Sequence, residues 1–242
     1  MVDQYFRILV NISSRYFLVA GLPFFIFYML LYRRIASAKI QKALPRGSDY
    51  LREIGYSLMT ICLFALIPLL LVFNEDIRPY TSLYREIDEM GWTYYFLAFP
   101  IMALMHDTYF YWTHRLMHHP KLYRTMHSVH HASVNPSPWA AYAFHPTEAI
   151  VEIGIFVIFI FTLPVHRTHI FIFFLFSIIY NVYGHLGWEL YSGKFINSRI
   201  GRWINTSLQH NLHHRQFNGN YGLYFLFWDR WMGTLRSEKS EN

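Results

Sequence analysis

The chain has little cysteine, little charge and no long block of one charge sign. Its single cysteine, Cys62, excludes an internal disulfide and a zinc site built from several cysteines. Only 15% of the residues are charged, and the net charge of +6 is spread along the chain, so we expect no nucleic-acid partner. The first residues lack the pattern of a cleaved secretory signal, so we expect the first apolar segment to be retained.

Apolar residues are abundant instead. Hydrophobic residues make up 54% of the chain and aromatic residues 20%, which is high for a soluble globular protein. Five uncharged runs approach the length that crosses a bilayer as a helix. These runs are residues 16–32, 54–74, 90–105, 153–165 and 170–184. The sequence therefore predicts an all-α, polytopic membrane protein with about four to five transmembrane or re-entrant helices, the last two runs forming a hairpin near residues 149–184.

The loops between the first runs differ in charge. Residues 33–52 carry six basic residues and one acid, whereas residues 75–89 carry five acids and two basic residues. Because basic loops favour the cytoplasmic side, the first loop is expected in the cytoplasm and the second on the opposite side. Counting crossings from there places the histidine groups on the cytoplasmic face of a multi-pass protein of a bacterial inner membrane or the endoplasmic reticulum.

Histidine is concentrated in three short groups. Seven of the fourteen histidines lie in residues 106–131, and His127-x-x-His130-His131 is repeated as His210-x-x-His213-His214. His114 and His118 are four residues apart, so on a helix they share one face. Adjacent histidines diverge by about 100° on a helix, so they face two different ions. Eight grouped imidazoles exceed the three or four that one zinc ion takes, which favours two metal ions.

Imidazole alone does not select among zinc, copper, iron and nickel. The sequence has no HExxH motif, which argues against a zinc hydrolase. Isolated histidines are weaker candidates: His185 lies in YGHLGWE, His145 in AFHPTE, and His106 at the start of the first group. Three acids, Asp107, Glu148 and Glu189, are either acceptors that orient imidazole N–H groups or ordinary interfacial residues.

The motifs HRLMH, HSVHH and HNLHH, together with AFHPTE, YGHLGWE and FNGNYGLYFLFWDRWMGT, resemble the fatty acid hydroxylase and sterol desaturase superfamily of integral membrane di-iron oxygenases. The resemblance covers residues 106–234. It implies a cytosolic, helical, histidine-rich cap that binds two iron ions, with zinc as a substitute that purification can introduce. The first motif can end at His118 or at His119. The ligands implied are His114, His118, His127, His130, His131, His185, His210, His213 and His214, with His145 as a candidate tenth.

The same resemblance implies an O2-dependent lipid oxygenase that hydroxylates a C–H bond of a fatty acyl chain, a sphingolipid or a sterol. Desaturation of a sterol or acyl lipid at the same site is the alternative. No HPGG-type cytochrome b5 segment is present, so a separate electron donor is expected, either a ferredoxin or cytochrome b5 with its reductase.

The chain then divides into N-terminal transmembrane helices (1–105), a di-metal catalytic region (106–234) and a disordered tail (235–242). A metal-binding membrane transporter is the rival from another class. It should carry ionisable ligands in mid-membrane, and the first two apolar runs contain none.

Overall fold

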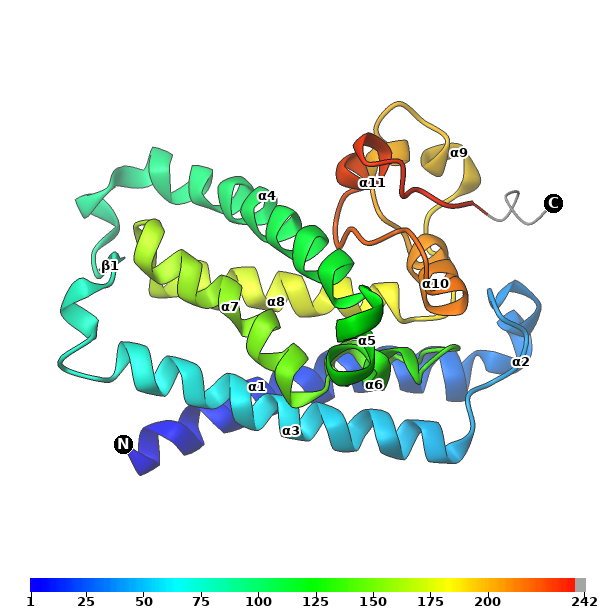
Figure 1. Ribbon diagram of the computed structural model, residues 1–242, viewed down its shortest axis with the longest axis horizontal. Coiled ribbons are helices and arrows are strands. Elements are labelled where there is room, and N and C mark those ends of the chain that lie inside the picture. Colours follow the sequence, from blue (N-terminus) through cyan, green and yellow to red (C-terminus); the bar gives the residue numbers. More distant parts are fainter. Residues whose placement is uncertain (238–242) are drawn as a thin grey trace.

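The computed structural model describes residues 1–237 and is built from long helices that lie side by side (Figure 1). Their residue patterns are apolar enough to favour burial against one another or against lipid. The two short strands pair in parallel. The all-α prediction is therefore confirmed. The long elements are α1 (Val2–Pro23) with a π-helix (Phe24–Leu30), α3 (Gly47–Val72), α4 (Gly91–Met117), α7 (Pro146–Thr162) and α8 (Arg167–Gly184), and the strands are β1 (Leu83–Tyr84) and β2 (Val165–His166).

Short helices gather at one end of the long ones, while β1 lies at the other end (Figure 1). These short helices are α2 (Tyr32–Ile35), α5 (Pro120–Met126), α6 (Ser128–His131), α9 (Gly193–Ile196), α10 (Ser207–Gln216) and α11 (Phe227–Trp231). Single 3₁₀ turns span Ala36–Ala38, Arg78–Tyr80, Ile87–Glu89, Pro138–Tyr142 and Gly201–Trp203. Of the predicted tail, residues 238–242 lie outside the described residues.

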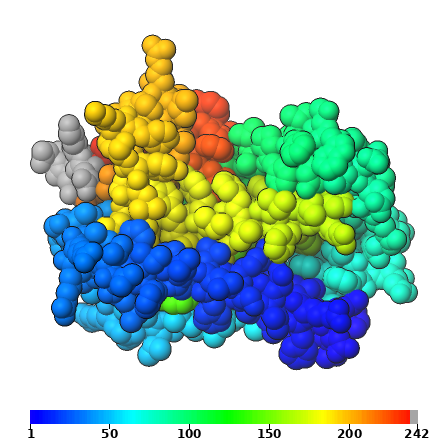
Figure 2. All heavy atoms as spheres, turned by 180° about the vertical axis from the view of Figure 1, so that it is seen from behind, coloured from blue at the N-terminus to red at the C-terminus, as the bar shows by residue number. Residues whose placement is uncertain are grey.

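Two helices within residues 1–237 are long and apolar enough to cross a membrane, Val2–Leu30 and Gly47–Val72. Figure 2 shows that α1 covers one side of the molecule beside α8. On α1 the side chains of Leu18 and Leu22 are 70% and 62% exposed, which suits contact with lipid better than contact with water.

The first helix begins earlier than the uncharged run predicted. The run started at residue 16 with Arg15 as its border, whereas the helix starts at Val2 and changes to a π-helix after Pro23. A single charged residue does not interrupt backbone hydrogen bonding, so the helix continues through it. Arg15 therefore lies in the middle of a helix that is long enough to span a membrane.

The third apolar run, residues 90–105, continues as one helix into the first histidine group. Helix α4 ends at Met117, so it carries His106 and His114 and has His118 as its C-terminal cap. Its Met102 belongs to the main hydrophobic core, together with Phe159 of α7 and Phe173 of α8.

Helices α7 and α8 form the predicted hairpin, and its tip lies far from the histidine groups. The tip strand β2 pairs with β1 of the acidic loop, and the Ser82 amide donates to the Ile160 carbonyl at 2.7 Å. At 17 and 18 residues, each arm is about 26 Å long. The hairpin is therefore shorter than α3 and α4, which have 26 and 27 residues.

The basic loop packs at the opposite end, against the segments that carry the histidines. Lys39 donates to the Asn135 side chain at 3.0 Å, and Gln41 donates to the Asn211 side chain at 2.9 Å. The Ile40 amide also donates to the Gly187 carbonyl at 2.9 Å. The basic loop and the segments that carry the three histidine groups thus lie at one end of the bundle, and the acidic loop lies at the other end.

Candidate metal centre

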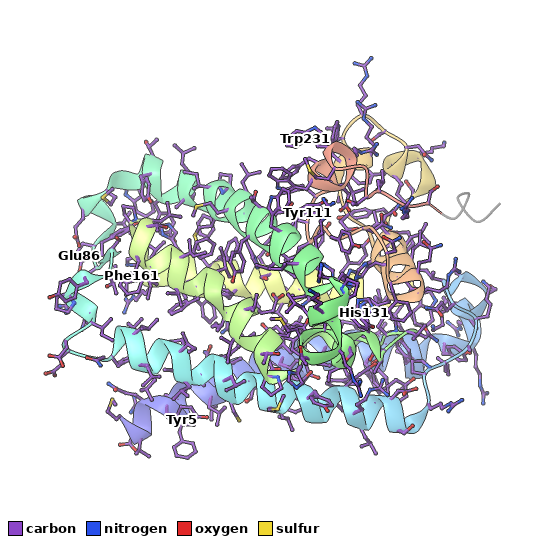
Figure 3. The ribbon with its side chains drawn as sticks, in the orientation of Figure 1. Tyr5, Glu86, Tyr111, His131, Phe161 and Trp231 are labelled. Carbon is purple, nitrogen blue, oxygen red and sulfur yellow. The ribbon has the colours of Figure 1, made fainter. Side chains whose placement is uncertain are left out.

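Nine histidines form two clusters where α4, α6 and α10 meet, near the labelled His131 (Figure 3). Eight of these side chains are buried and His118 is half-buried. In each cluster one ring nitrogen from every histidine lies within 4.8 Å of the others. The five-histidine cluster contains His114, His118, His127, His131 and His213, and the four-histidine cluster contains His130, His185, His210 and His214.

Helical geometry sends sequence neighbours to different clusters. His130 and His131 point away from each other, with ring centres 5.8 Å apart, and His213 and His214 do the same at 5.8 Å. Histidines four residues apart, in contrast, lie on one helical face and share a cluster, as His127 shares one with His131 and His210 shares one with His214. The two HxxHH motifs therefore each contribute to both clusters.

Backbone carbonyls fix the proton positions on several rings. The Nδ1 atoms of His114, His213 and His185 lie 2.9 Å, 2.7 Å and 2.7 Å from the carbonyl oxygens of Tyr221, Gly219 and Asn181. A carbonyl only accepts hydrogen bonds, so Nδ1 must carry the proton in each ring. The Nε2 atom of each of these neutral rings then presents an unshared electron pair to its cluster.

The Nε2 atoms lie closer together than hydrogen bonds among the imidazole rings can explain. His131 Nε2 lies 3.1 Å from His118 Nε2 and 3.0 Å from His213 Nε2, but it can donate only one proton. In the other cluster the corresponding distances are 3.3 Å for His130–His185, 3.1 Å for His185–His210 and 3.2 Å for His210–His214.

A metal ion accounts for this arrangement. With metal–nitrogen bonds of about 2.1 Å, neighbouring ligand nitrogens lie about 3.0 Å apart at right angles and about 3.4 Å apart in a tetrahedron. The observed distances of 3.0 to 3.3 Å fit that interval. The Nε2 atoms of His114 and His127 are also buried without a hydrogen-bond partner. Each cluster can therefore hold one metal ion.

Burial keeps these imidazoles neutral. Loss of hydration, reinforced by neighbouring histidines, lowers the pKa of His130, His131 and His214 well below the ordinary value. The same causes lower the pKa of His127 and His210. Neutral rings at physiological pH are the form that binds a metal.

Buried acids hold the clusters in place from outside. The Glu148 carboxylate lies 2.6 Å from His127 Nδ1. Asp107 accepts hydrogen bonds from the Tyr224 and Phe225 amides, and Asp229 accepts from the Tyr221 and Gly222 amides. The two aspartates thereby fix the segment whose Tyr221 carbonyl holds His114.

Of the three acids that the sequence singled out, only Glu148 contacts a histidine of the clusters. Glu189 accepts from the Leu208 amide at 3.1 Å, next to the start of α10. Sequence reasoning missed Asp229. The available signal was an acid that directly follows the apolar and aromatic segment 221–228.

The remaining candidates lie outside both clusters. His145 caps α7 and bonds the Thr147 hydroxyl at 2.8 Å, and His119 caps α5 by accepting from the Lys121 amide at 3.3 Å. His106 lies 3.0 Å from the Tyr224 hydroxyl. The structure thus brings His118, rather than His119, together with the other histidines and does not bring His145 there.

A cavity of about 350 Å³, lined mainly by apolar side chains, lies beside the clusters. Two aromatic rings form its inner end: Phe110, 5.0 Å from the His114 ring, and Phe144, 5.2 Å from the His130 ring. A second cavity of about 450 Å³ shares Phe156 and Arg167 with it and extends to the acidic loop. The first volume lies within the range of small-molecule sites, about 300 to 1,000 Å³.

Residues 99–234 match the family model described as fatty acid hydroxylase. The chain is 34% identical over 170 residues to a Delta(7)-sterol 5(6)-desaturase of Gibberella zeae, covering 70% of this chain and 51% of that protein. It is 31% identical over 192 residues to the lathosterol oxidase of Rattus norvegicus, with 78% and 62% covered.

A further relative is a Delta(7)-sterol 5(6)-desaturase of Aspergillus fumigatus, 30% identical over 238 residues, with 94% of this chain and 68% of that protein covered. The chain thus spans about half the length of the Gibberella protein, and most of the Aspergillus protein. No solved structure matches the chain.

Proposed function

The chain belongs to the fatty acid hydroxylase family, and from this membership we propose that it is an O2-dependent oxidoreductase that acts on a membrane lipid. The observation that carries the proposal is the pair of all-imidazole clusters at the inner end of an apolar cavity. The cavity suits a hydrocarbon substrate, and the clusters suit a pair of redox metals.

We infer that the nine clustered histidines hold two iron ions, one in each cluster. Five imidazoles in one cluster exceed the four ligands of a tetrahedral zinc site, and imidazole is a good ligand for iron. When bound, the iron pair supplies the activation of O2 for attack on a C–H bond. The protein's own part is to orient the imidazoles through Glu148 and the backbone carbonyls, and to exclude water with Phe110 and Phe144.

Two reaction outcomes share this site. Hydroxylation uses O2, two donor electrons and two protons, and yields the hydroxylated lipid and one water. Desaturation uses the same O2, donor electrons and protons, removes two hydrogens from neighbouring carbons, and yields two waters. The printed names of the relatives describe sterol desaturation and lathosterol oxidation, which favours desaturation of a sterol over hydroxylation of an acyl chain or sphingolipid. The electrons come from a separate donor, a ferredoxin or cytochrome b5 with its reductase.

We further propose a multi-pass membrane protein with the histidine end in the cytoplasm. The basic loop 33–52 packs against the histidine-bearing segments, while the acidic loop 75–89 meets the hairpin tip at the other end. This arrangement agrees with the preference of basic loops for the cytoplasm. A metal transporter should instead place its ligands along a path across the membrane, whereas both clusters lie at one end of the bundle.

Comparative lipid mass spectrometry tests this function. Membranes from cells that express the protein should gain a lipid that differs from its precursor by the loss of two hydrogen atoms or by the addition of one oxygen atom. Cells that express the His131→Ala variant serve as the control. If lipid profiles are identical while cellular metal content changes, the oxygenase proposal is wrong and transport is favoured.

A further inference from the structure

Three partly buried polar side chains line the cavity without a hydrogen-bond partner among the described residues: Arg15 of α1, Tyr142 at the end of a 3₁₀ turn, and Glu152 of α7. The Nε and Nη1 atoms of Arg15 are buried and make no hydrogen bond. Within residues 1–237, neither the Glu152 carboxyl group nor the Tyr142 hydroxyl forms a hydrogen bond. The same cavity is therefore lined by a hydrogen-bond donor, an acceptor and a hydroxyl group, none of which has a hydrogen-bond partner among the described residues.

The three groups come from different parts of the chain and line one cavity. Tyr142 lines it together with Arg15 and Glu152. Its ring stacks on Tyr16, the neighbour of Arg15, with ring centres 5.8 Å apart. The Arg15 guanidinium group also lies 5.4 Å from the centre of the Phe171 ring, which holds it on the cavity side of α1.

This polar group of residues lies near the metal end of the cavity. The Tyr142 ring is 6.3 Å from the Phe144 ring, which is 5.2 Å from the His130 ring. Glu152 follows Glu148, the partner of His127, by one helical turn, a rise of about 6 Å. A ligand group bound to Tyr142 would therefore be linked to the four-histidine cluster through a single intervening ring, that of Phe144.

Protein stability does not explain these residues. An unpaired charge in an apolar site costs free energy, and an apolar side chain of similar size would stabilise the fold better. Glu53 shows the contrast: it is fully buried, and its carboxyl group accepts hydrogen bonds from Ser133 and Ser137. Ionisable residues inside a membrane helix that face an internal cavity generally mark a functional site.

We propose that Arg15, Tyr142 and Glu152 bind a hydroxyl group of the lipid substrate and select a lipid alcohol. A hydroxyl accepts a hydrogen bond from Arg15 and donates one to Glu152, so it satisfies both groups at once. A carboxylate can accept from Arg15 but has no proton to donate to Glu152, while a pure hydrocarbon leaves all three groups without a partner. This inference deepens the proposed function, because it names the chemical feature by which the same cavity recognises its substrate.

Lipid binding to the metal-free protein in nanodiscs tests the inference. The probes are a Δ7-sterol and the same sterol with its hydroxyl replaced by hydrogen, and hexadecanol, hexadecane and hexadecanoate. At least one alcohol should bind about ten-fold more tightly than its hydroxyl-free counterpart, because the counterpart leaves the polar groups unpaired. Equal binding within both sets would overturn the inference.

Variants identify the residues responsible. Arg15→Met, Glu152→Leu and Tyr142→Phe should each weaken binding of the alcohol about ten-fold and leave binding of the hydroxyl-free lipid unchanged. Arg7→Met is the matched control, since Arg7 lies on the same helix at the exposed rim of the cavity, and it should keep the wild-type preference. A variant that weakens both lipids equally contradicts the assignment.

Thermal unfolding separates recognition from a structural role. Because Arg15 and Glu152 have no hydrogen-bond partner among the described residues, Arg15→Met and Glu152→Leu should keep or raise the Tm of the metal-free protein. A fall of several degrees in both would show that they support the fold. Binding needs neither metal nor O2, so a protein that oxidises lipid without hydroxyl preference refutes this inference alone. A protein with that preference but no oxidation refutes the proposed function alone.

Discussion

Replacing His131 with alanine is expected to abolish lipid oxidation. His131 lies at the centre of the five-histidine cluster, 3.1 Å from His118 and 3.0 Å from His213 between Nε2 atoms. Loss of a residue that only supports a metal ligand costs about 10- to 100-fold, so loss of a central ligand should cost more than about 100-fold. Product formed by the ferrous-reconstituted protein, measured by mass spectrometry, gives the result.

His119→Ala and His145→Ala are matched controls for that variant. Each of these histidines is the N-cap residue of a helix, α5 or α7, and lies outside the clusters. Their removal should therefore lower the free energy of unfolding by about 1 kcal/mol or less and leave turnover near wild type. If His145→Ala loses as much activity as His131→Ala, His145 is a ligand and the two-cluster assignment must change. Wild-type turnover in His131→Ala would contradict the assignment altogether.

Replacing Glu148 with glutamine is expected to weaken metal binding about 10- to 100-fold. The Glu148 carboxylate accepts the Nδ1 proton of His127 at 2.6 Å, which leaves Nε2 with its electron pair directed into the five-histidine cluster. Glutamine keeps the shape and can still accept, but it removes the negative charge that makes the imidazole a stronger ligand. Competition with a chelator of known affinity measures the change.

Glu152→Gln is the control for metal affinity. Glu152 follows Glu148 by one turn of α7 but lines the cavity and contacts no histidine, so its replacement should leave metal affinity unchanged while altering lipid binding. The role assigned to Glu148 is incorrect if both glutamine variants lower metal affinity by the same factor.

The sequence predicted those features that depend only on residues close together along the chain. Histidine spacing on a helix is a local property, so the shared cluster of His114 and His118 and the divergence of His130 from His131 followed from the helical repeat. The continuation of the third apolar run into the first histidine group as one helix, α4, is also a local property, because His106 follows Met105 directly and no proline or glycine stands between Met105 and Met117.

Other features depend on the path of the backbone and could not be read from the sequence. The Gly219 carbonyl that holds His213 is aimed by a turn in which Gly219 has φ +85° and Asn220 has φ 56°. A Cβ atom at Gly219 would lie 2.3 Å from the Thr234 carbonyl oxygen, so the turn requires glycine. The residue types in a sequence do not identify which backbone carbonyl will accept a hydrogen bond from a given imidazole.

Arg15 illustrates a different limit. Counting uncharged residues placed it at the border of a membrane segment, because a charge within a span is costly and is usually taken as its end. The helix instead extends from Val2 to Leu30, and Arg15 turns toward a cavity rather than toward lipid. Its surroundings depend on the packing of α8 beside α1, which no local pattern in the sequence specifies.

The number of iron ions bound per chain tests the central claim most directly. Protein reconstituted anaerobically with ferrous iron, freed of excess metal and analysed by elemental mass spectrometry, should contain two iron ions per chain, one for each histidine cluster. A single bound iron ion, or none, in folded protein would contradict the two-cluster account.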